Sequence, residues 1–211
     1  MFYSDNQFKK IYFCNSNKMF VLNDNNWMLQ NENINLKTIS HQEVLKIYQN
    51  SSNKIILPIS VVGAGNPNEE EYLVAYEFGK IMAEIGITVL CGGRSGVMEA
   101  VCKGVAQNHG IAIGMLPNLD IEDANKYLSI AIPTGIGLSR NTIIATAGFC
   151  MFSIGGTHGT LSEIAFALQY KKLVMSIYLP YNINGIINVA NIDEVLVNIC
   201  NHILFKNGTP K

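Results

Sequence analysis

The residues best suited to chemistry lie in one short stretch, residues 150–164, which runs through glycines and hydroxyl side chains to a lone carboxylate, Glu163. The stretch begins with an apolar run and ends with apolar residues at helical spacing, which predicts a strand, a glycine turn and a helix. Glycines let the backbone approach a ligand, and the first turn of a helix offers unpaired N–H groups to an anion. We therefore expect a phosphate-binding turn, whose contacts are Gly156, Thr157, His158, Gly159 and Thr160.

Glu163 is unusual at such a turn, because it places a negative charge near the start of a helix that otherwise suits phosphate. One explanation is that the carboxylate complements the positive end of the helix dipole. Another involves Arg140, whose guanidinium either holds a ligand or forms a salt bridge with Glu163 or Glu99 that orders the loops. The sequence leaves these alternatives open.

Two further glycine turns follow predicted strands in the same way. An apolar run at 55–62, interrupted by Pro58, leads to a turn at 63–68, and the run at 87–91 leads to a turn at 92–96. The carboxyl ends of parallel strands lie at one edge of the sheet, so we expect all three turns to meet there. The predicted ligand contacts in these two turns are Gly63, Gly65, Asn66, Gly92, Gly93, Arg94, Ser95 and Gly96. For Asn66 a turn-forming role is the stronger alternative, and Arg94 also suits a solvated loop cation.

The elements that position these turns are short apolar strands alternating with amphipathic helices. This alternation predicts an α/β fold, a Rossmann-like, doubly wound, mainly parallel sheet with helices on both faces and about six strands. We assign residues 54–211 to this nucleotide-binding domain and expect its last helix at 193–204.

Residues 1–53 differ in character and are rich in asparagine, so we expect a small N-terminal appendage. Apolar runs at 11–13 and 19–22 predict a β-hairpin, and the run at 27–29 predicts a third strand. Apolar residues at helical spacing between 41 and 48 predict a helix, with Ser40 as its N-cap.

The composition excludes several kinds of partner. A net charge of −1 gives no electrostatic argument for nucleic acid or an anionic membrane. No apolar run approaches the roughly 18 residues of a membrane span, and the N-terminus has no secretory pattern. The five cysteines are scattered without a C-x-x-C motif, which predicts reduced thiols and no metal site. We therefore expect a cytoplasmic protein that binds neither nucleic acid nor membrane.

Three common chemistries do not fit the turns. The dinucleotide motif G-x-G-x-x-G begins at Gly63 but has Asn68 in place of its third glycine, and the second strand ends in Cys91 and Gly92 rather than an acid. No turn carries the Gly-Lys-Ser/Thr of a P-loop, and no serine lies in a G-x-S-x-G setting. A phosphate or nucleotide pocket with one acid and one or two arginines remains.

Three ordered motifs resemble a known family. Gly-Gly-x-x-Gly-Val-Met at 92–98, Ser-Arg-Asn at 139–141 and Gly-x-x-Gly-Thr-x-x-Glu at 156–163 are similar to motifs of the Lonely Guy, or lysine decarboxylase-like, superfamily. The resemblance covers residues 55–177, most of the predicted sheet. It implies a nucleotide-binding Rossmann fold and the cleavage of the N-glycosidic bond of a purine nucleoside 5′-monophosphate, as in a phosphoribohydrolase. By position in the motifs, it implies that Glu163 and Arg140 are the catalytic pair.

The chain departs from the superfamily motif at three positions: Gly155 replaces a proline, Thr157 a glycine and Asn141 a lysine. These departures resemble the branch that contains the molybdenum cofactor carrier proteins and relatives of DprA/Smf. That branch implies an alternative function, a carrier or sensor that holds molybdenum cofactor or a signalling nucleotide without turnover. In either case the implied partner is a small nucleotide-like ligand, and the implied assembly is a homodimer or a higher homo-oligomer.

Overall fold

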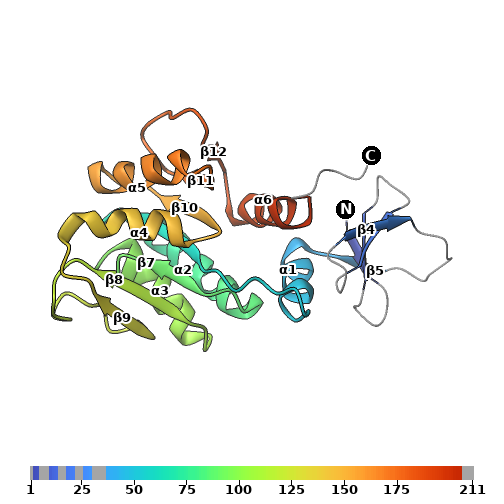
Figure 1. Ribbon diagram of the computed structural model, residues 1–211, viewed down its shortest axis with the longest axis horizontal. Coiled ribbons are helices and arrows are strands. Elements are labelled where there is room, and N and C mark those ends of the chain that lie inside the picture. The colour runs from blue at the N-terminus through green and yellow to red at the C-terminus, as the bar shows by residue number, and fades with distance from the viewer. Residues whose placement is uncertain (1, 5–9, 14–17, 22–25, 30–36, 206–211) are drawn as a thin grey trace. The chain divides into compact units, whose positions relative to one another are not determined.

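The computed structural model describes residues 2–4, 10–13, 18–21, 26–29 and 37–205, and the chain forms two compact units (Figure 1). The larger unit spans Ile56–Ile192, and the smaller combines Met1–Ile55 with Asp193–Lys211. Residues 193–211 thus group with the N-terminal segment, whereas the sequence assigned them to the sheet domain.

The larger unit is built on a parallel sheet of seven strands, which confirms the predicted α/β, Rossmann-like fold. The order across the sheet is β12-β11-β10-β6-β7-β8-β9. The seventh strand was not predicted, because β12 has only two residues and both are exposed at the edge of the sheet. The strands are β6 (Ile59–Gly63), β7 (Val89–Cys91), β8 (Ala112–Leu116), β9 (Ile130–Pro133), β10 (Cys150–Ile154), β11 (Leu173–Ile177) and β12 (Ile187–Asn188).

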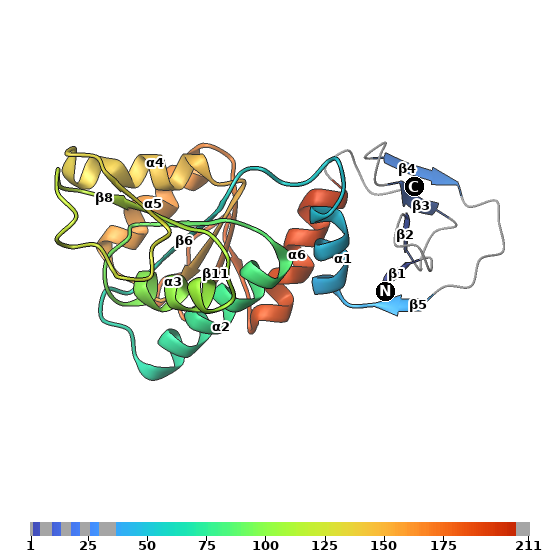
Figure 2. The same ribbon diagram turned by 90° about the horizontal axis from the view of Figure 1, so that it is seen from below.

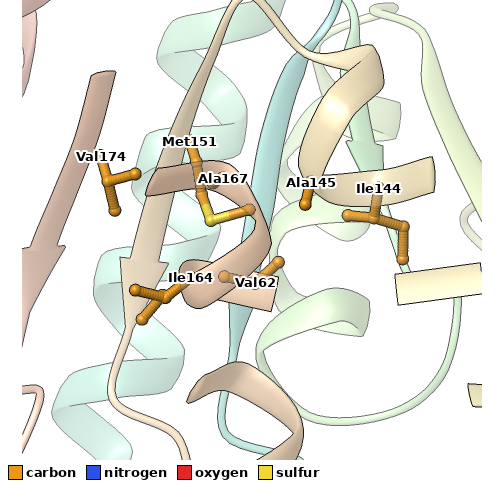
Figure 3. Packing of buried hydrophobic residues seen from close by; sticks show 7 residues of the cluster. All are labelled: Val62, Ile144, Ala145, Met151, Ile164, Ala167 and Val174. Carbon is orange, nitrogen blue, oxygen red and sulfur yellow. The ribbon is translucent and has the colours of Figure 1, made fainter. Parts of the chain in front are cut away.

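Helices cover both faces of this sheet. The pair α2 (Glu69–Ile85) and α3 (Val97–Gln107) lies on one face, and α4 (Arg140–Ala147) and α5 (His158–Gln169) lie on the other (Figures 1 and 2). Successive side chains of a strand point to opposite faces, so neighbouring residues of β10 reach the two helix layers. Phe152 packs against Phe78 of α2 with ring centroids 4.8 Å apart. Met151 faces α4 and α5 in a buried apolar cluster (Figure 3), which consists of Val62, Ile144, Ala145, Met151, Ile164, Ala167 and Val174.

Local sequence signals account for the ends of the long helix α2. Asn68 caps its first turn by accepting a hydrogen bond from the Glu71 N–H, and the Glu71 carboxylate accepts one from the Asn68 N–H. Gly86 ends the helix in a left-handed conformation with φ of 90°, which glycine adopts without steric cost. The helix thus begins in the acidic run at 69–71 and stops at Gly86.

The smaller unit contains an antiparallel sheet with the order β4-β3-β2-β1-β5. The predicted hairpin, third strand and helix are confirmed, with Ser40 as the N-cap of the helix, and two more strands extend the sheet. Its elements are β1 (Phe2–Ser4), β2 (Lys10–Phe13), β3 (Lys18–Val21), β4 (Asn26–Leu29), β5 (Lys37–Ile39), α1 (His41–Gln49) and α6 (Ile192–Leu204). Helices α1 and α6 lie side by side in both views, and the Cys200 thiol donates a hydrogen bond to the His41 carbonyl at 3.4 Å. No helix in the described part of the chain is long and apolar enough to cross a membrane.

Candidate functional site

The centre of the sheet contains a topological switch point, where β6 and β10 are neighbours. From β6 the chain continues to β7, β8 and β9 on one side, whereas from β10 it continues to β11 and β12 on the other. Open parallel sheets bind ligands at such a point, beyond the carboxyl ends of the strands. The three predicted glycine turns follow β6, β7 and β10, so all of them lie at this edge.

Backbone contacts link the three turns directly through Gly63 and Ala64, at the end of β6. The Ala64 carbonyl accepts a hydrogen bond from the Val97 N–H, the first residue of α3, at 3.0 Å. The Gly63 carbonyl accepts one from the Thr160 hydroxyl of α5 at 3.2 Å. Gly63 has no room for a side chain, because a Cβ there would collide with the Ile154 carbonyl oxygen. The starts of α3 and α5 therefore flank one short segment.

The two flanking helices begin without the side-chain caps that close α2. Among the described residues, no side chain accepts a hydrogen bond from the first turn of α3, which follows Gly96, or of α5, which follows Thr157. Thr157, His158 and Gly159 are exposed at the start of α5. A helix N-terminus with open N–H groups and a positive dipole end is a ready anion site. Two such helix starts border the switch point.

Arg140 and Glu163 form an ion pair behind these helix starts. Arg140 Nη1 lies 3.1 Å from Glu163 Oε1, and the two residues are only 6% and 7% exposed. The guanidinium also lies against the turn after β7, since a Cβ on Gly92 would stand 2.7 Å from Nη2. Arg140 Nε is buried without a hydrogen-bond partner in the described residues. Of the two salt-bridge partners considered for Arg140, the structure pairs it with Glu163 and not Glu99.

Burial sets the protonation of this pair. Desolvation raises the pKa of Glu163 from 4.5 to about 7, and the neighbouring Arg140 opposes that rise. Burial likewise lowers the pKa of Arg140, with Glu163 acting in the opposite direction. The Glu163 carboxyl can therefore gain or lose a proton near neutral pH, as a general acid or base requires.

Asn141, next to Arg140 in α4, is linked to the first turn of α5, a contact that sequence reasoning missed. Its Nδ2 donates to the Ser162 hydroxyl at 2.9 Å, and that hydroxyl donates to the Gly159 carbonyl at 2.7 Å. Asn141 Oδ1 is buried, and no described group donates to it. The sequence signal for this contact is the asparagine that stands in place of the motif lysine.

The turn after β7 is also stabilised by Asn125, a contact that the sequence did not indicate. The Asn125 side chain donates to the carbonyls of Gly93 and Arg94, at 3.1 Å each. The Arg94 guanidinium is half-exposed, with Asp123 3.8 Å from its Nε. Ser95 next to it is exposed.

The remaining predicted ligand contacts lie in the turn after β6. Gly65 and Asn66 are exposed in that turn, and nothing lies within 4 Å of a Cβ built on Gly65. In the part of the chain that the structure describes, no three His, Cys, Asp or Glu side chains gather as metal ligands.

Comparisons with known proteins place the larger unit in a family. The model of the SLOG cluster4 family matches residues 56–201. An uncharacterised protein from Archaeoglobus fulgidus is 39% identical over 145 residues, which cover 69% of this chain and 95% of that protein. The family match extends into α6, whereas the compact units separate most of α6 from the sheet, so the domain boundary stays a prediction.

Two solved structures share sequence as well as fold with this chain. The molybdenum cofactor binding protein from Rippkaea orientalis is 32% identical, with a TM-score of 0.57, and the match covers 70% of this chain and 87% of that one. The molybdenum cofactor carrier protein from Chlamydomonas reinhardtii is 29% identical, with a TM-score of 0.64 and coverage of 70% and 98%.

A more distant structure shares only the fold. DNA processing protein A from Helicobacter pylori, described with single-stranded DNA, is 16% identical with a TM-score of 0.55, over 68% of this chain and 80% of that one. Together with the family match, these neighbours confirm the resemblance drawn from the sequence motifs. The expectation that this chain binds no nucleic acid stays a prediction.

Proposed function

This chain belongs to the SLOG cluster4 family, and on that premise we propose that it binds a small nucleotide-like ligand through its phosphate and carries it without turnover. The ligand lies at the carboxyl edge of the sheet, over the switch point between β6 and β10. The observation that carries this proposal is the segment Gly63–Ala64, which contacts the first turns of both α3 and α5, where the following N–H groups have no side-chain cap.

The residues at this edge fit the phosphate of such a ligand. Open backbone N–H groups in two glycine-led helix starts offer donors from two directions, and the dipoles of both helices favour negative charge. Arg140 adds a cation that keeps one donor, Nε, unused in the described structure. The same donors would hold the phosphate of a molybdenum cofactor, the ligand named for the relatives from Rippkaea orientalis and Chlamydomonas reinhardtii.

The burial of Glu163 supports a carrier more than a hydrolase. In a glycosidase-like reaction this carboxylate would face the sugar, to stabilise positive charge or to orient water. Here Glu163 is instead buried against Arg140, and Arg140 against Gly92, so the pair joins two turns of the site. The pair then orders the anion-binding edge without touching the bond to be cleaved.

One observation favours hydrolysis as a second candidate. The pKa of Glu163, raised to about 7 by burial, suits a group that exchanges a proton at neutral pH. In this function the enzyme cleaves the N-glycosidic bond of a purine nucleoside 5′-monophosphate. Glu163 then acts on the sugar, and Arg140 holds the phosphate or the leaving base.

Ligand retention and turnover are measured on the same preparation. The protein is purified, released ligands are identified by mass spectrometry, and nucleoside 5′-monophosphates are then incubated with the wild type and with Glu163→Gln. A carrier retains ligand and releases no more free base than the Glu163→Gln variant. If only the wild type releases base and ribose phosphate, the protein is a hydrolase and the carrier function is refuted. If the protein neither retains a ligand nor releases base, both functions are refuted.

We also propose that the larger unit forms a homodimer through its β9 edge. Ile130 and Ile132 of this edge strand are exposed, as are Leu119 in a loop and Leu138 in the short 3-10 helix Gly137–Ser139. Exposed apolar groups on an edge strand favour pairing with another chain. Light scattering of the wild type and of Ile132→Lys tests the homodimer, because the charge should leave the variant monomeric.

A further inference from the structure

A second carboxylate lies at the switch point, and neither the sequence motifs nor the anion site accounts for it. Glu71 stands in the first turn of α2, which follows β6, and its side chain reaches the turn that follows β10. These are the two strands between which the chain reverses its direction across the sheet. Glu71 therefore lies in the crevice where a ligand of this fold binds.

The two oxygens of this carboxylate have different surroundings. Oε2 accepts a hydrogen bond from the Asn68 backbone N–H at 2.9 Å, and the Asn68 side chain accepts one from the Glu71 N–H at 2.9 Å. This reciprocal pair fixes the side chain. Oε1 lies against Gly155 and accepts no hydrogen bond from any group in the described residues.

Gly155 makes space for that free oxygen. Its φ is +55°, a conformation that residues with a side chain rarely adopt, and a Cβ there would collide with Oε1 of Glu71. Gly155 thus lets the carboxylate stand directly beside the turn that leads to the open start of α5. Capping of α2 requires one oxygen only, so it does not explain why the other is directed at this turn.

We infer that Oε1 of Glu71 contacts the ligand and accepts a hydrogen bond from a sugar hydroxyl next to the bound phosphate. This inference rests on the proposed function. The open N–H groups of α3 and α5 attract the anionic part of the ligand, whereas a carboxylate accepts hydrogen bonds and repels a second anion. The part of the ligand beside Glu71 is therefore neutral and carries donors, and in a nucleotide the groups next to the phosphate that meet both conditions are the ribose hydroxyls.

The same charge gives the site its selectivity. A nucleoside monophosphate places one phosphate on the helix starts and hydroxyls beside Glu71. A nucleoside 3′,5′-bisphosphate replaces one of those hydroxyls with a second phosphate, which the carboxylate disfavours. Glu71 thus selects ligands with a single phosphate and a free hydroxyl pair.

Calorimetric titration with three probes tests this role: adenosine 5′-monophosphate, its 2′,3′-dideoxy analogue and adenosine 3′,5′-bisphosphate. The variant Glu71→Gln keeps an oxygen for the Asn68 N–H, so the cap of α2 persists, but it removes the charge. The matched control is Glu70→Gln, which removes the same charge from an exposed neighbouring position.

The wild type should bind the monophosphate about tenfold more tightly than the dideoxy analogue, as loss of a charged hydrogen bond predicts. Glu71→Gln should lose most of that preference and bind the bisphosphate more tightly, while Glu70→Gln should match the wild type. Equal wild-type affinity for the monophosphate and the dideoxy analogue would overturn the inference and leave the proposed function intact. The inference would also be overturned, with the proposed function intact, if Glu71→Gln and Glu70→Gln changed the affinities for all three probes by the same factor. A wild type that binds none of the probes would overturn the proposed nucleotide-like ligand and this inference with it.

Discussion

The Arg140 guanidinium and the Glu163 carboxylate are each other's partners, 3.1 Å apart and almost fully buried beneath the glycine turns. The sequence motifs imply that these two residues act on a substrate, but in the structure each neutralises the other. An isolated charge at this depth is costly, whereas a buried pair is tolerated when its geometry is good. The pair therefore fixes the relative positions of α4, α5 and the turn after β7.

Removing one member of this pair should destabilise the protein strongly. Arg140→Ala leaves an unpaired carboxylate in the interior, and we expect a loss of about 3–5 kcal/mol in the free energy of unfolding at pH 8. Urea denaturation measures it. The control is Arg94→Ala, which breaks a half-exposed contact of 3.8 Å to Asp123 and should cost under about 1 kcal/mol. Equal losses in the two variants would show that the buried pair has no special role.

The raised pKa of Glu163 predicts a definite dependence of stability on pH. Folding raises this pKa from 4.5 to about 7, so the folded state binds the proton more tightly than the unfolded state. The resulting stabilisation is complete below about pH 4.5 and is lost as the pH rises through about 7. Glu163→Gln cannot titrate and serves as the reference.

Between pH 5 and 8 the unfolding free energy of the wild type should fall relative to Glu163→Gln by roughly 3 kcal/mol. Denaturant unfolding at several pH values gives this difference. A difference that is flat across this range, or that rises with pH, would mean that the carboxyl is ionised throughout.

Alanine substitutions at two glycines of the same turn should have different effects on stability. Gly63→Ala forces a Cβ against the backbone oxygen of Ile154, which cannot move aside, and we expect a loss of at least about 2 kcal/mol. Gly65→Ala meets nothing within 4 Å and should change stability by no more than about 0.5 kcal/mol. Thermal unfolding gives the melting temperature of each variant, and similar melting temperatures would contradict the packing role of Gly63.

Much of the larger unit could be predicted from the sequence, because its signals are local. Glycine turns after apolar runs indicated the strands, and the capping residue Ser40 indicated where a helix begins. The contacts of Asn125 and Asn141 could not be predicted in this way, since their partners are distant in the sequence. The short strand β12 was missed for a related reason: two exposed residues carry no apolar pattern.

The site was only partly predictable from the sequence. The motifs named Arg140 and Glu163, and parallel topology brought their loops to one edge. Their burial and mutual pairing depend on how α4 and α5 pack, which no local pattern specifies. The different capping of α2 and α5 is likewise visible only in the hydrogen bonds.

A negative charge at the start of α5 should stabilise the protein and weaken ligand binding at once. Thr157 has extended backbone geometry at the N-cap, and its side chain makes no capping hydrogen bond. Thr157→Asp should cap the helix, adding about 1 kcal/mol of stability, and should occupy the anion site. Affinity for adenosine 5′-monophosphate should fall about tenfold or more.

The matched control introduces the same charge at another helix start. Ser40 already caps α1 in the smaller unit, so Ser40→Asp should leave binding unchanged. Calorimetric unfolding and titration of both variants give the two effects. If Thr157→Asp binds ligand as well as Ser40→Asp does, the start of α5 is not part of the site.

The central claim is that the starts of α3 and α5 belong to one anion site, and amide chemical shifts measure it most directly. A ¹⁵N-labelled sample is titrated with adenosine 5′-monophosphate while the amides of Gly93, Gly96, Gly156 and Gly159 are followed. We expect all four amides to shift along a single binding curve with one dissociation constant, while the amides of Val44 and Leu45 in α1 of the smaller unit stay fixed. Shifts confined to one of the two turns, or two unrelated binding curves, would contradict it.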